Sequence, residues 1–375
     1  MPNPKTIIVV GGGIIGTMHA VLAVENGFKV TQIEKDRNPV SASVRNFGLI
    51  WVSGRLAGKE LDLALRAREL WEKIGTKTSI GFRSNGSLTV AQNEAEFSVM
   101  AEAMNMKDSD LRGFRLLTQE ETQKIEHSFA GNFVGSLQCV LDAAVEPNLL
   151  LGGLREYLQL SPLYNWLPET EIVDFNHNET GNHLRDRNNN LYSADYIAIC
   201  TGAIHDGLIS EFMSNAAVRK VHLQMAATLP IDVKINHSFA DADSLRYYPA
   251  FKNLNLHNLG PQSEIAAKYK MQLLAVQRNN GELTIGDTHE YDEPFSHEIF
   301  EEPYRHLTKA ISNILGIQPP ELERRWSGIY SQSTSEDIYF RREITPGVVI
   351  VTGGGGRGNT LAPAIAEETL NSWTN

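Results

Sequence analysis

A glycine-rich turn near the N-terminus constrains the fold of this chain more than any other feature. Residues 6–10 form a β-branched run of strand length, and Gly11-Gly12-Gly13-Ile14-Ile15-Gly16 follows it directly. A helix-compatible stretch then continues to Glu25, and a second apolar run at 29–33 leads into Glu34. Strand, glycine turn, helix, strand and acidic residue in this order predict a Rossmann-like dinucleotide-binding unit.

Three glycines of this turn and the helix start that follows each have a physical reason to be part of such a unit. Gly11 permits the tight turn, Gly13 lets the backbone approach a pyrophosphate, and Gly16 allows the helix to pack closely on the strand. The helix N-terminus, with Ile14 and Ile15 in its first turn, would face the phosphates with its partial positive charge.

Glu34 extends the predicted cofactor site to the adenosine end. It lies 23 residues after Gly11, close to the roughly 20-residue offset at which a carboxylate reaches ribose hydroxyls. A carboxylate at this position would also repel a 2′-phosphate. We include the neighbouring Lys35 in the predicted site.

Composition argues against several other classes of protein. Lys and Arg number 34 and Asp and Glu number 45, so the formal charge is 34 − 45 = −11, and no polybasic cluster is present. Nucleic acid and anionic membrane surfaces are therefore disfavoured as partners. Cys139 and Cys200 lack metal-ligand spacing, which predicts no disulfide framework, no metal site and a cytoplasmic location. The N-terminal apolar run is too short to span a bilayer.

The remaining pattern predicts two interleaved domains, as the length of 375 residues also suggests. Strands are expected at 86–90, 131–140, 169–176, 194–200 and 348–352, with helices at 59–74, 147–158, 303–315 and 362–372. Residues 218–329, including 244–251 and 282–287, are expected to form an antiparallel sheet with a covering helix. The predicted fold is α/β plus α+β, with a three-layer Rossmann-like domain of the glutathione-reductase type and an antiparallel-sheet substrate domain. We assign 1–80, 141–216 and 325–375 to the cofactor domain, and 81–140 and 217–324 to the substrate domain.

Four motifs carry a resemblance to a known family. They are the Gly11 to Gly16 turn with Glu34, the segment Ser43-Val44-Arg45-Asn46-Phe47-Gly48, the pair Thr201-Gly202 and the segment 352–363. Together they resemble the D-amino-acid oxidase, glycine oxidase and sarcosine oxidase superfamily of FAD-dependent oxidoreductases. Segments 43–51, 283–291 and 353–363 further resemble a branch associated with phosphonate catabolism, which implies 2-aminoethylphosphonate or its N-methyl derivative as substrate.

The resemblance implies a flavin between the two domains and assigns residues to it. Ser43, Arg45, Asn46 and Gly48 would line the flavin, Ile172 would approach the adenine, and Thr201-Gly202 would contact the cofactor. The final glycine loop and helix start would face the flavin pyrimidine, where N–H groups stabilise negative charge on the reduced ring. That loop comprises Gly355, Gly356, Arg357, Gly358, Asn359 and Thr360.

Three positions depart from better-known members of that superfamily. Gly328 aligns with the flavin-linking cysteine of sarcosine oxidases, which implies non-covalent FAD. Tyr330 falls where amino-acid-oxidising members often carry a carboxylate-binding arginine, and Thr284 falls where sarcosine oxidases use a lysine for oxygen activation. A plain amino-acid substrate is therefore in doubt, and both O2 and another electron acceptor are compatible with the sequence.

An anionic substrate head requires a cation, because guanidinium binds carboxylate or phosphonate through paired hydrogen bonds. We expect Arg357 to supply it, with Arg45 as second choice, and Tyr330, Tyr248 and Tyr247 are candidate hydroxyl donors or cage walls. His289 lies near Asp287 in the sequence, but we interpret it as a surface or hydrogen-bonded histidine outside the catalytic set.

Three alternatives stay open at this stage. The chain could oxidise sarcosine, glycine, proline or a D-amino acid, or it could be a non-catalytic FAD-binding subunit of a larger complex. A nicotinamide-linked dehydrogenase would fit the first glycine turn but would leave the C-terminal glycine loop without a role. The sequence predicts no oligomeric state.

Overall fold

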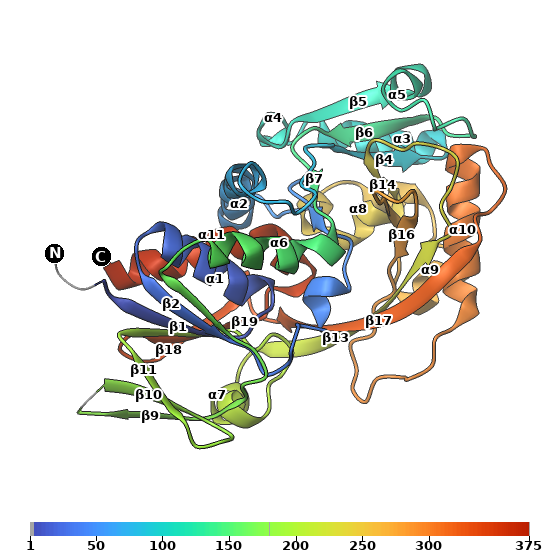
Figure 1. Cartoon of the computed structure of the whole chain (residues 1–375). Helices are drawn as coiled ribbons and strands as arrows, with labels where there is room; N and C mark the ends of the chain where they lie inside the picture. The colour runs from blue at the N-terminus through green and yellow to red at the C-terminus, as the bar shows by residue number, and fades with distance from the viewer. Residues whose placement is uncertain (1–3, 180, 375) are drawn as a thin grey trace.

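The computed structural model describes residues 4–179 and 181–374 and contains two large sheets that lie side by side (Figure 1). The predicted domain ranges also cover residues 1–3, 180 and 375, which lie outside the described residues. Each sheet has one face turned toward the region where the two meet, and this arrangement positions the candidate site.

A six-stranded sheet forms the centre of the N-terminal unit. Its first strand pairs in parallel with both neighbours, as the strand–helix–strand pattern predicts, and only the edge strand β18 runs antiparallel. In spatial order the strands are β18 (Phe340–Thr345), β19 (Val348–Thr352), β12 (Tyr196–Ile199), β1 (Thr6–Val10), β2 (Lys29–Ile33) and β8 (Tyr164–Leu167). Residues 340–352 therefore share a sheet with residues 6–10.

The two faces of this sheet are covered by different structures, which makes three layers (Figure 1). Ile7 and Val9 of β1 face one core together with four helices, whereas Ile8 and Val10 face a second core against a small antiparallel sheet. The helices are α1 (Ile14–Glu25), α2 (Lys59–Gly75), α6 (Pro147–Gln159) and α11 (Gly358–Thr374), and the small sheet contains β9 (Ile172–Asn178), β10 (Gly181–Asp186) and β11 (Leu191–Ala194).

An eight-stranded sheet forms the second unit and is antiparallel except for the parallel pair β14 and β4. In spatial order its strands are β17 (Leu322–Ser333), β13 (Val218–Thr228), β16 (Leu283–Gly286), β15 (Leu274–Gln277), β14 (Ser238–Asp241), β4 (Ser87–Ala91), β6 (Gly135–Cys139) and β5 (Phe114–Thr118). Helix α10 (Glu301–Leu315) buries Leu307 and Ile311 against one face. The other face carries Leu223, Met225 and Tyr330 toward the first unit.

Short elements connect these two sheets. A two-stranded ladder joins β3 (Leu49–Ile50) to β7 (Ala143–Ala144). The shorter helices are α3 (Glu94–Ala103), α4 (Ser109–Arg112), α5 (Gln119–Ile125), α7 (Ser210–Met213), α8 (Asp243–Tyr247) and α9 (Glu264–Tyr269), and single 3-10 turns are η1 (Ala42–Val44), η2 (Gly207–Ile209), η3 (Pro249–Phe251), η4 (Leu256–Leu259) and η5 (Gly355–Arg357). No helix among the described residues has the length and apolarity that crossing a membrane requires.

The predicted fold class is confirmed, and two local predictions were wrong. Residues 244–251 were expected in a strand but form α8 and η3, where Tyr248 stacks on Trp51 and tertiary packing overrides β-propensity. The domain boundary at residue 325 falls inside β17, which pairs with β13 along its length, so residues 325–333 belong to the eight-stranded sheet. The rest of the domain division stays a prediction.

Asp142 joins segments of the two units in a buried hydrogen-bond cluster. Its carboxylate accepts hydrogen bonds from the backbone N–H groups of Val52 (2.5 Å) and Ser53 (3.0 Å), and from the hydroxyls of Ser53 (2.7 Å) and Ser87 (2.6 Å). Burial raises the pKa of Asp142, while these donors oppose the rise. Since Ser87 lies in β4 and Ser53 follows β3, the cluster attaches the eight-stranded sheet to the segment that follows the β3–β7 ladder.

Replacing Asp142 with alanine should therefore destabilise the whole fold. Four buried donors would lose a charged acceptor, and we expect the free energy of unfolding to fall by about 3 kcal/mol or more. Chemical denaturation followed by tryptophan fluorescence measures the change. The exposed Asp232 offers a control, because Asp232→Ala should alter stability by no more than about 0.5 kcal/mol. Equal effects of the two substitutions would contradict the role of the cluster.

Candidate active site

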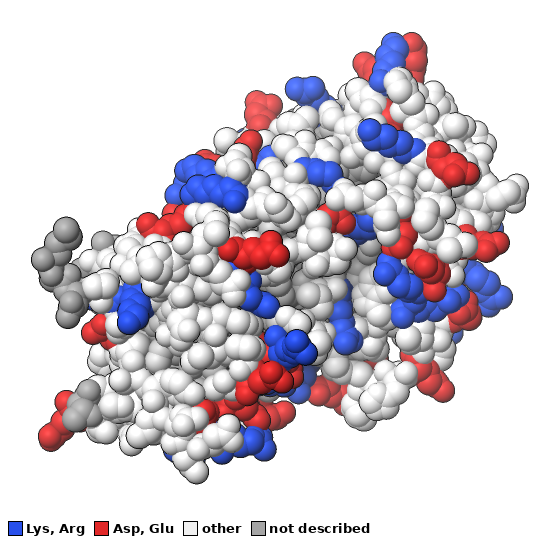
Figure 2. Space-filling model, in the orientation of Figure 1, with Lys and Arg blue, Asp and Glu red and all other residues white. Residues whose placement is uncertain are grey.

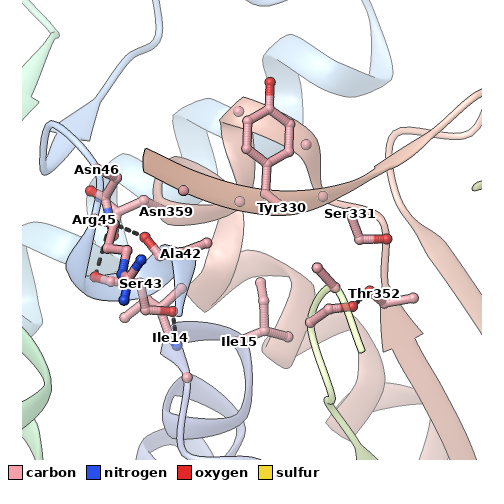
Figure 3. A pocket seen from close by; sticks show the side chains of 18 of the residues that line it. Ile14, Ile15, Ala42, Ser43, Arg45, Asn46, Tyr330, Ser331, Thr352 and Asn359 are labelled. Carbon is pink, nitrogen blue, oxygen red and sulfur yellow. Dashed lines mark hydrogen bonds between the residues drawn. The ribbon is translucent and has the colours of Figure 1, made fainter. Parts of the chain in front are cut away.

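A cavity lies where α1, the C-terminal glycine loop and the eight-stranded sheet meet. We call it the glycine-lined cavity. Figure 3 shows Ile14, Ile15 and Ser43 on one side of it and Tyr330, on β17, on the other. The predicted site residues that line it are Gly13, Ile14, Ile15, Ser43, Arg45, Asn46, Gly202, Tyr330, Gly355, Gly356, Gly358 and Asn359.

The first glycine turn has the close contacts that the motif predicts. Gly11 has φ +114°, and a Cβ there would lie 2.3 Å from the backbone oxygen of Cys200, which immediately follows β12. A Cβ at Gly16 would lie 2.2 Å from the oxygen of Gly11. Because no side chain fits at these two positions, α1 starts directly at the edge of β1, and its N-terminus opens into the cavity.

The segment after β2 forms the adjacent wall. Ser43 Oγ accepts a hydrogen bond from the backbone N–H of Ile14 at 2.9 Å, which attaches this segment to the start of α1. The Asn46 side chain donates to the carbonyls of Ala42 and Ser43 at 2.9 Å and accepts from the N–H of Gly48 at 2.6 Å. Asn46 thus stabilises the loop that forms the wall, and Arg45 is exposed, with Nη1 donating to the Ser327 carbonyl at 3.0 Å.

Glu34 lies at the far end of the turn, where the prediction places a ribose. Its Oε2 accepts from the N–H of Gly12 at 2.6 Å and its Oε1 accepts from the N–H of Asp36 at 3.0 Å. Each carboxylate oxygen has a second lone pair. The buried carboxylate is therefore held in place with two lone pairs available to hydroxyl donors.

Five other predicted cofactor residues lie away from the wall of this cavity. Lys35 is exposed, Gly48 contacts the backbone of Val145, and the Thr201 hydroxyl donates to the carbonyl of Ile204. Ile172 is buried in the core beside Ile33. Thr360 Oγ1 accepts from the N–H of Trp51 at 2.9 Å, so it anchors the start of α11. Their predicted contacts with the cofactor stay predictions.

A second cavity opens beside the first, and we call it the arginine-lined cavity. It contains Arg55, Arg219, Arg246 and Arg357 among its lining residues. Asn46, Phe47, Asp287, Gly356 and Asn359 line both cavities, so the two share a wall. A molecule in the second cavity would therefore contact a group held in the first. On the face shown in Figure 2, Lys and Arg side chains lie around a hollow, with Asp and Glu side chains among them.

Arg357, the preferred substrate cation in the sequence prediction, lies in this second cavity. Its Nη1 is 3.0 Å from Glu60 Oε1, and Arg55 Nη1 is 3.6 Å from the same oxygen. Arg55 also donates from Nε to the carbonyl of Trp51 at 2.8 Å. Two cations share one buried carboxylate, which leaves this cluster with one net positive charge. Sequence reasoning missed Arg55, because a loop arginine without a periodic pattern gives no signal of its burial.

Tyrosines form the apolar wall of the arginine-lined cavity. Tyr248 stacks on Trp51 with ring centroids 6.0 Å apart, and the Arg55 guanidinium lies 5.6 Å from the Tyr248 ring. A Cβ at Gly356 would lie 3.6 Å from Tyr247 Oη and 3.7 Å from Tyr330 Oη, so both hydroxyls face the C-terminal glycine loop. Burial raises the pKa of both phenols, which stay neutral hydrogen-bonding groups.

Asp287 is a second residue that sequence reasoning left outside the site. It follows β16 directly and lines both cavities. His289, interpreted from the sequence as a surface or hydrogen-bonded residue, is buried, and its Nε2 lies 3.7 Å from Asp287 Oδ2. The signal in the sequence was an acidic residue at the end of a predicted strand, but nothing local places that strand end at the cavity.

These features fit a flavin dinucleotide. The turn around Gly11 and Gly16 fits a pyrophosphate, Glu34 fits a ribose, and the starts of α1 and α11 both open into the glycine-lined cavity. Neither helix has an acidic residue in its first turn, so their positive ends are unopposed there. In residues 4–179 and 181–374 no three His, Cys, Asp or Glu side chains gather as a metal-binding group.

Comparison with known proteins identifies the class. Residues 6–371 match the model of the DAO family, described as FAD dependent oxidoreductase, and the chain belongs to this family. It is an FAD-dependent oxidoreductase, which confirms the predicted cofactor and class of enzyme.

Individual relatives are more distant. A subunit of the opine oxidase of Rhizobium meliloti is 25% identical over 169 residues, a match that spans 40% of this chain and 44% of that protein. The chain thus matches less than half the length of this curated relative. Glycine oxidase of Bacillus cereus ATCC 14579 has a TM-score of 0.79 at 19% identity, covering 99% of this chain and 95% of that one. L-alpha-glycerophosphate oxidase of Mycoplasma pneumoniae, solved with FAD bound, has a TM-score of 0.74 at 18% identity, covering 100% and 95%.

Glu34 and Lys35 form a matched pair for testing the adenosine end of the site. Glu34→Ala should weaken FAD binding roughly 10- to 100-fold, because hydrogen bonds to a buried carboxylate contribute about 1.5–3 kcal/mol. Lys35→Ala should weaken FAD binding much less, because Lys35 is exposed and solvent screens any contact that its charge makes with the cofactor. Titration of the apoprotein with FAD, followed by quenching of flavin fluorescence, measures both. Equal affinity of Glu34→Ala and wild type would contradict this placement of the ribose.

Proposed function

We propose that this enzyme oxidises the carbon–nitrogen bond of a small amine that carries an anionic group, with 2-aminoethylphosphonate or its N-methyl derivative as the substrate class. The observation that supports this proposal is the arginine-lined cavity, which shares a wall with the glycine-lined cavity. FAD, when bound, supplies the two-electron acceptor for such an oxidation.

In this proposal, some residues of the arginine-lined cavity bind the anionic group of the substrate and others exclude water. Arg357 and Arg55 bind the anionic head, because they share Glu60 and keep one uncompensated positive charge. Guanidinium groups suit a phosphonate, since they present paired donors to its oxygens. Tyr248 and Trp51 exclude water from one side, which strengthens these charge interactions.

The orientation of the substrate follows from the shared wall. An anion bound at Arg357 would place the other end of a short substrate toward Asp287, Asn46 and Gly356, which line both cavities. The amine-bearing carbon would then face the glycine-lined cavity. Positioning of this kind is the main contribution that a protein makes to flavin-dependent oxidation.

FAD is proposed to be bound without a covalent link. Gly328 lines the glycine-lined cavity and offers no nucleophilic side chain. Thr284 accepts a hydrogen bond from Arg278 Nε at 2.8 Å, so a threonine with a half-buried arginine beside it stands where sarcosine oxidases use an oxygen-activating lysine. The electron acceptor is proposed as O2 or another oxidant.

The relatives supply an alternative substrate class. The opine oxidase and glycine oxidase are named for amino-acid-like substrates, so sarcosine, glycine or a D-amino acid forms the alternative. A non-catalytic FAD-binding subunit is the alternative from another class, because the opine oxidase relative is one subunit of its enzyme.

Anaerobic mixing of the purified flavoprotein with a panel of amines distinguishes these functions. We expect N-methyl-2-aminoethylphosphonate and 2-aminoethylphosphonate to bleach the visible flavin absorbance faster than sarcosine, glycine or D-alanine, because a phosphonate carries more negative charge toward the arginines. Faster bleaching by the amino acids would assign the alternative substrate class. A flavin that dithionite reduces and none of the amines reduces would indicate the non-catalytic subunit.

Substitution of Arg357 and of Arg45 tests which of the two binds the anionic group of the substrate. Arg357→Ala should lower kcat/KM roughly 100-fold, mainly through KM, since a charge-assisted hydrogen bond contributes about 1.5–3 kcal/mol. Arg45→Ala should change KM much less, because the Arg45 side chain is exposed and lies outside the arginine-lined cavity. Steady-state kinetics with thermal melts of both variants give the comparison, and the reverse order of effects would place the anion at Arg45.

A further inference from the structure

Asp287 is an acidic residue beside both cavities, and the proposed function has so far given it no chemical role. Among the described residues that line the two cavities it is the only acidic one, and it lines both. Its side chain is 10% exposed and lies at the end of β16, at the boundary between the two cavities. A carboxylate in this position faces any molecule that bridges them.

None of the four arginines of the arginine-lined cavity neutralises Asp287. Arg55 and Arg357 pair with Glu60, Arg246 pairs with Asp243, and Arg219 donates to Gln332. Asp287 instead contacts Gln272, whose Nε2 donates to Oδ1 at 3.1 Å, and His289, at 3.7 Å from Oδ2. Within the described part of the chain, the carboxylate therefore lacks a permanent cation of its own.

A hydrogen bond to the backbone determines the tautomer of the neutral His289 ring. Nδ1 lies 2.9 Å from the backbone carbonyl of Lys270, and a carbonyl only accepts, so Nδ1 carries a proton. In the neutral ring Nε2 is then unprotonated, and it points toward Asp287 Oδ2. Asp287 thus has a proton acceptor behind it.

Burial makes this carboxylate a stronger base than an exposed aspartate. Loss of solvation raises the pKa of Asp287, and the nearby His289 opposes the rise. The other titratable groups near it are phenols, namely Tyr247, Tyr248, Tyr291 and Tyr330, whose pKa values burial also raises. They stay neutral and leave the charge on Asp287 uncompensated until a cation arrives.

A small amine arrives with a proton that must leave before oxidation. Aliphatic amines have a pKa near that of lysine, about 10, so they are ammonium ions at neutral pH. The lone pair on nitrogen that drives oxidation of the adjacent carbon is then occupied by the proton. The enzyme needs a group that removes it.

We propose that Asp287 accepts the proton of the substrate ammonium and passes it to His289, an inference that rests on the proposed amine oxidation. The N–H bond of the ammonium breaks and an O–H bond forms on Asp287, while the bonding electron pair stays on nitrogen. One negative and one positive charge become two neutral groups, and nothing is oxidised or reduced in this step. Transfer of the proton from Asp287 to His289 Nε2 then restores the carboxylate.

The test measures the pH dependence of anaerobic flavin reduction by N-methyl-2-aminoethylphosphonate. Asp287→Asn keeps the size and the Gln272 contact but accepts no proton, so reduction near neutral pH should slow roughly 100-fold or more. The rate should recover as the pH rises toward the pKa of the free amine, because the substrate then arrives deprotonated. Asp287→Glu should keep part of the reduction rate near neutral pH, because it still has a carboxylate. The exposed Asp292→Asn should show the same pH dependence of flavin reduction as the wild type.

A second readout is independent of turnover. The quaternary N,N,N-trimethyl analogue has no proton to lose, and its binding can be followed by perturbation of the flavin spectrum. It should bind roughly 10-fold more weakly to Asp287→Asn than to wild type, because a facing charge is lost.

The outcomes separate this inference from the proposed function. Suppose that amines reduce the flavin of the wild type and that Asp287→Asn leaves the pH dependence of this reduction unchanged. That result would overturn the role of Asp287 but not the proposed amine oxidation. A variant that is uniformly slow, without recovery at high pH, would also overturn proton transfer and leave a positioning role. A wild type that no amine reduces, although dithionite does, would reject the proposed oxidation and this step with it.

Discussion

The position of α1 depends on two backbone contacts that leave no room for a side chain. A Cβ at Gly11 would overlap the carbonyl of Cys200, and one at Gly16 would overlap the carbonyl of Gly11. These contacts bring the start of α1 to the carboxyl edge of the parallel strands β1 and β12. Helix α11 then packs against α1 in the same core, so the starts of both helices open into one cavity. The C-terminal glycine loop thus lines the same cavity as the N-terminal turn.

The second sheet completes the site because β13 and β17 extend across the boundary between the two units. Ser333 at the end of β17 donates to the carbonyl of Gly353, which attaches this sheet to the C-terminal loop. Gly328 and Tyr330 are thereby placed over the glycine-lined cavity. Face alternation in β17 puts them on one side, and Ile329 between them is exposed. A shift of register by one residue would turn Tyr330 away from the cavity.

Local patterns in the sequence indicate those parts of the candidate site that a single segment contributes. The turn from Gly11 to Gly16, the helix starts and Glu34 depend on spacing within about 25 residues, which sequence periodicity reports directly. Arg55 and Asp287 are site candidates only because segments far apart in the sequence line the same cavity, and no local pattern around either residue encodes that arrangement. Tyr248 shows the same limit: its segment has strand-like composition, yet stacking on Trp51 favours a helix and a 3-10 turn. Tertiary contacts override β-propensity at such positions.

Each of the two cavities contains a charge without a full counter-charge, and a substrate with both an anion and an ammonium group would supply both counter-charges. Glu60 neutralises only one of the two guanidinium groups of Arg55 and Arg357, which leaves one positive charge in the arginine-lined cavity. Asp287 leaves a negative charge at the wall shared with the glycine-lined cavity, where His289 is its nearest ionisable partner. A molecule with an anion at one end and an ammonium at the other would balance both. An apolar amine would satisfy only Asp287, and a simple anion would satisfy only the arginines. In the proposed function, the two charges together favour a substrate that carries both an anionic group and an amine.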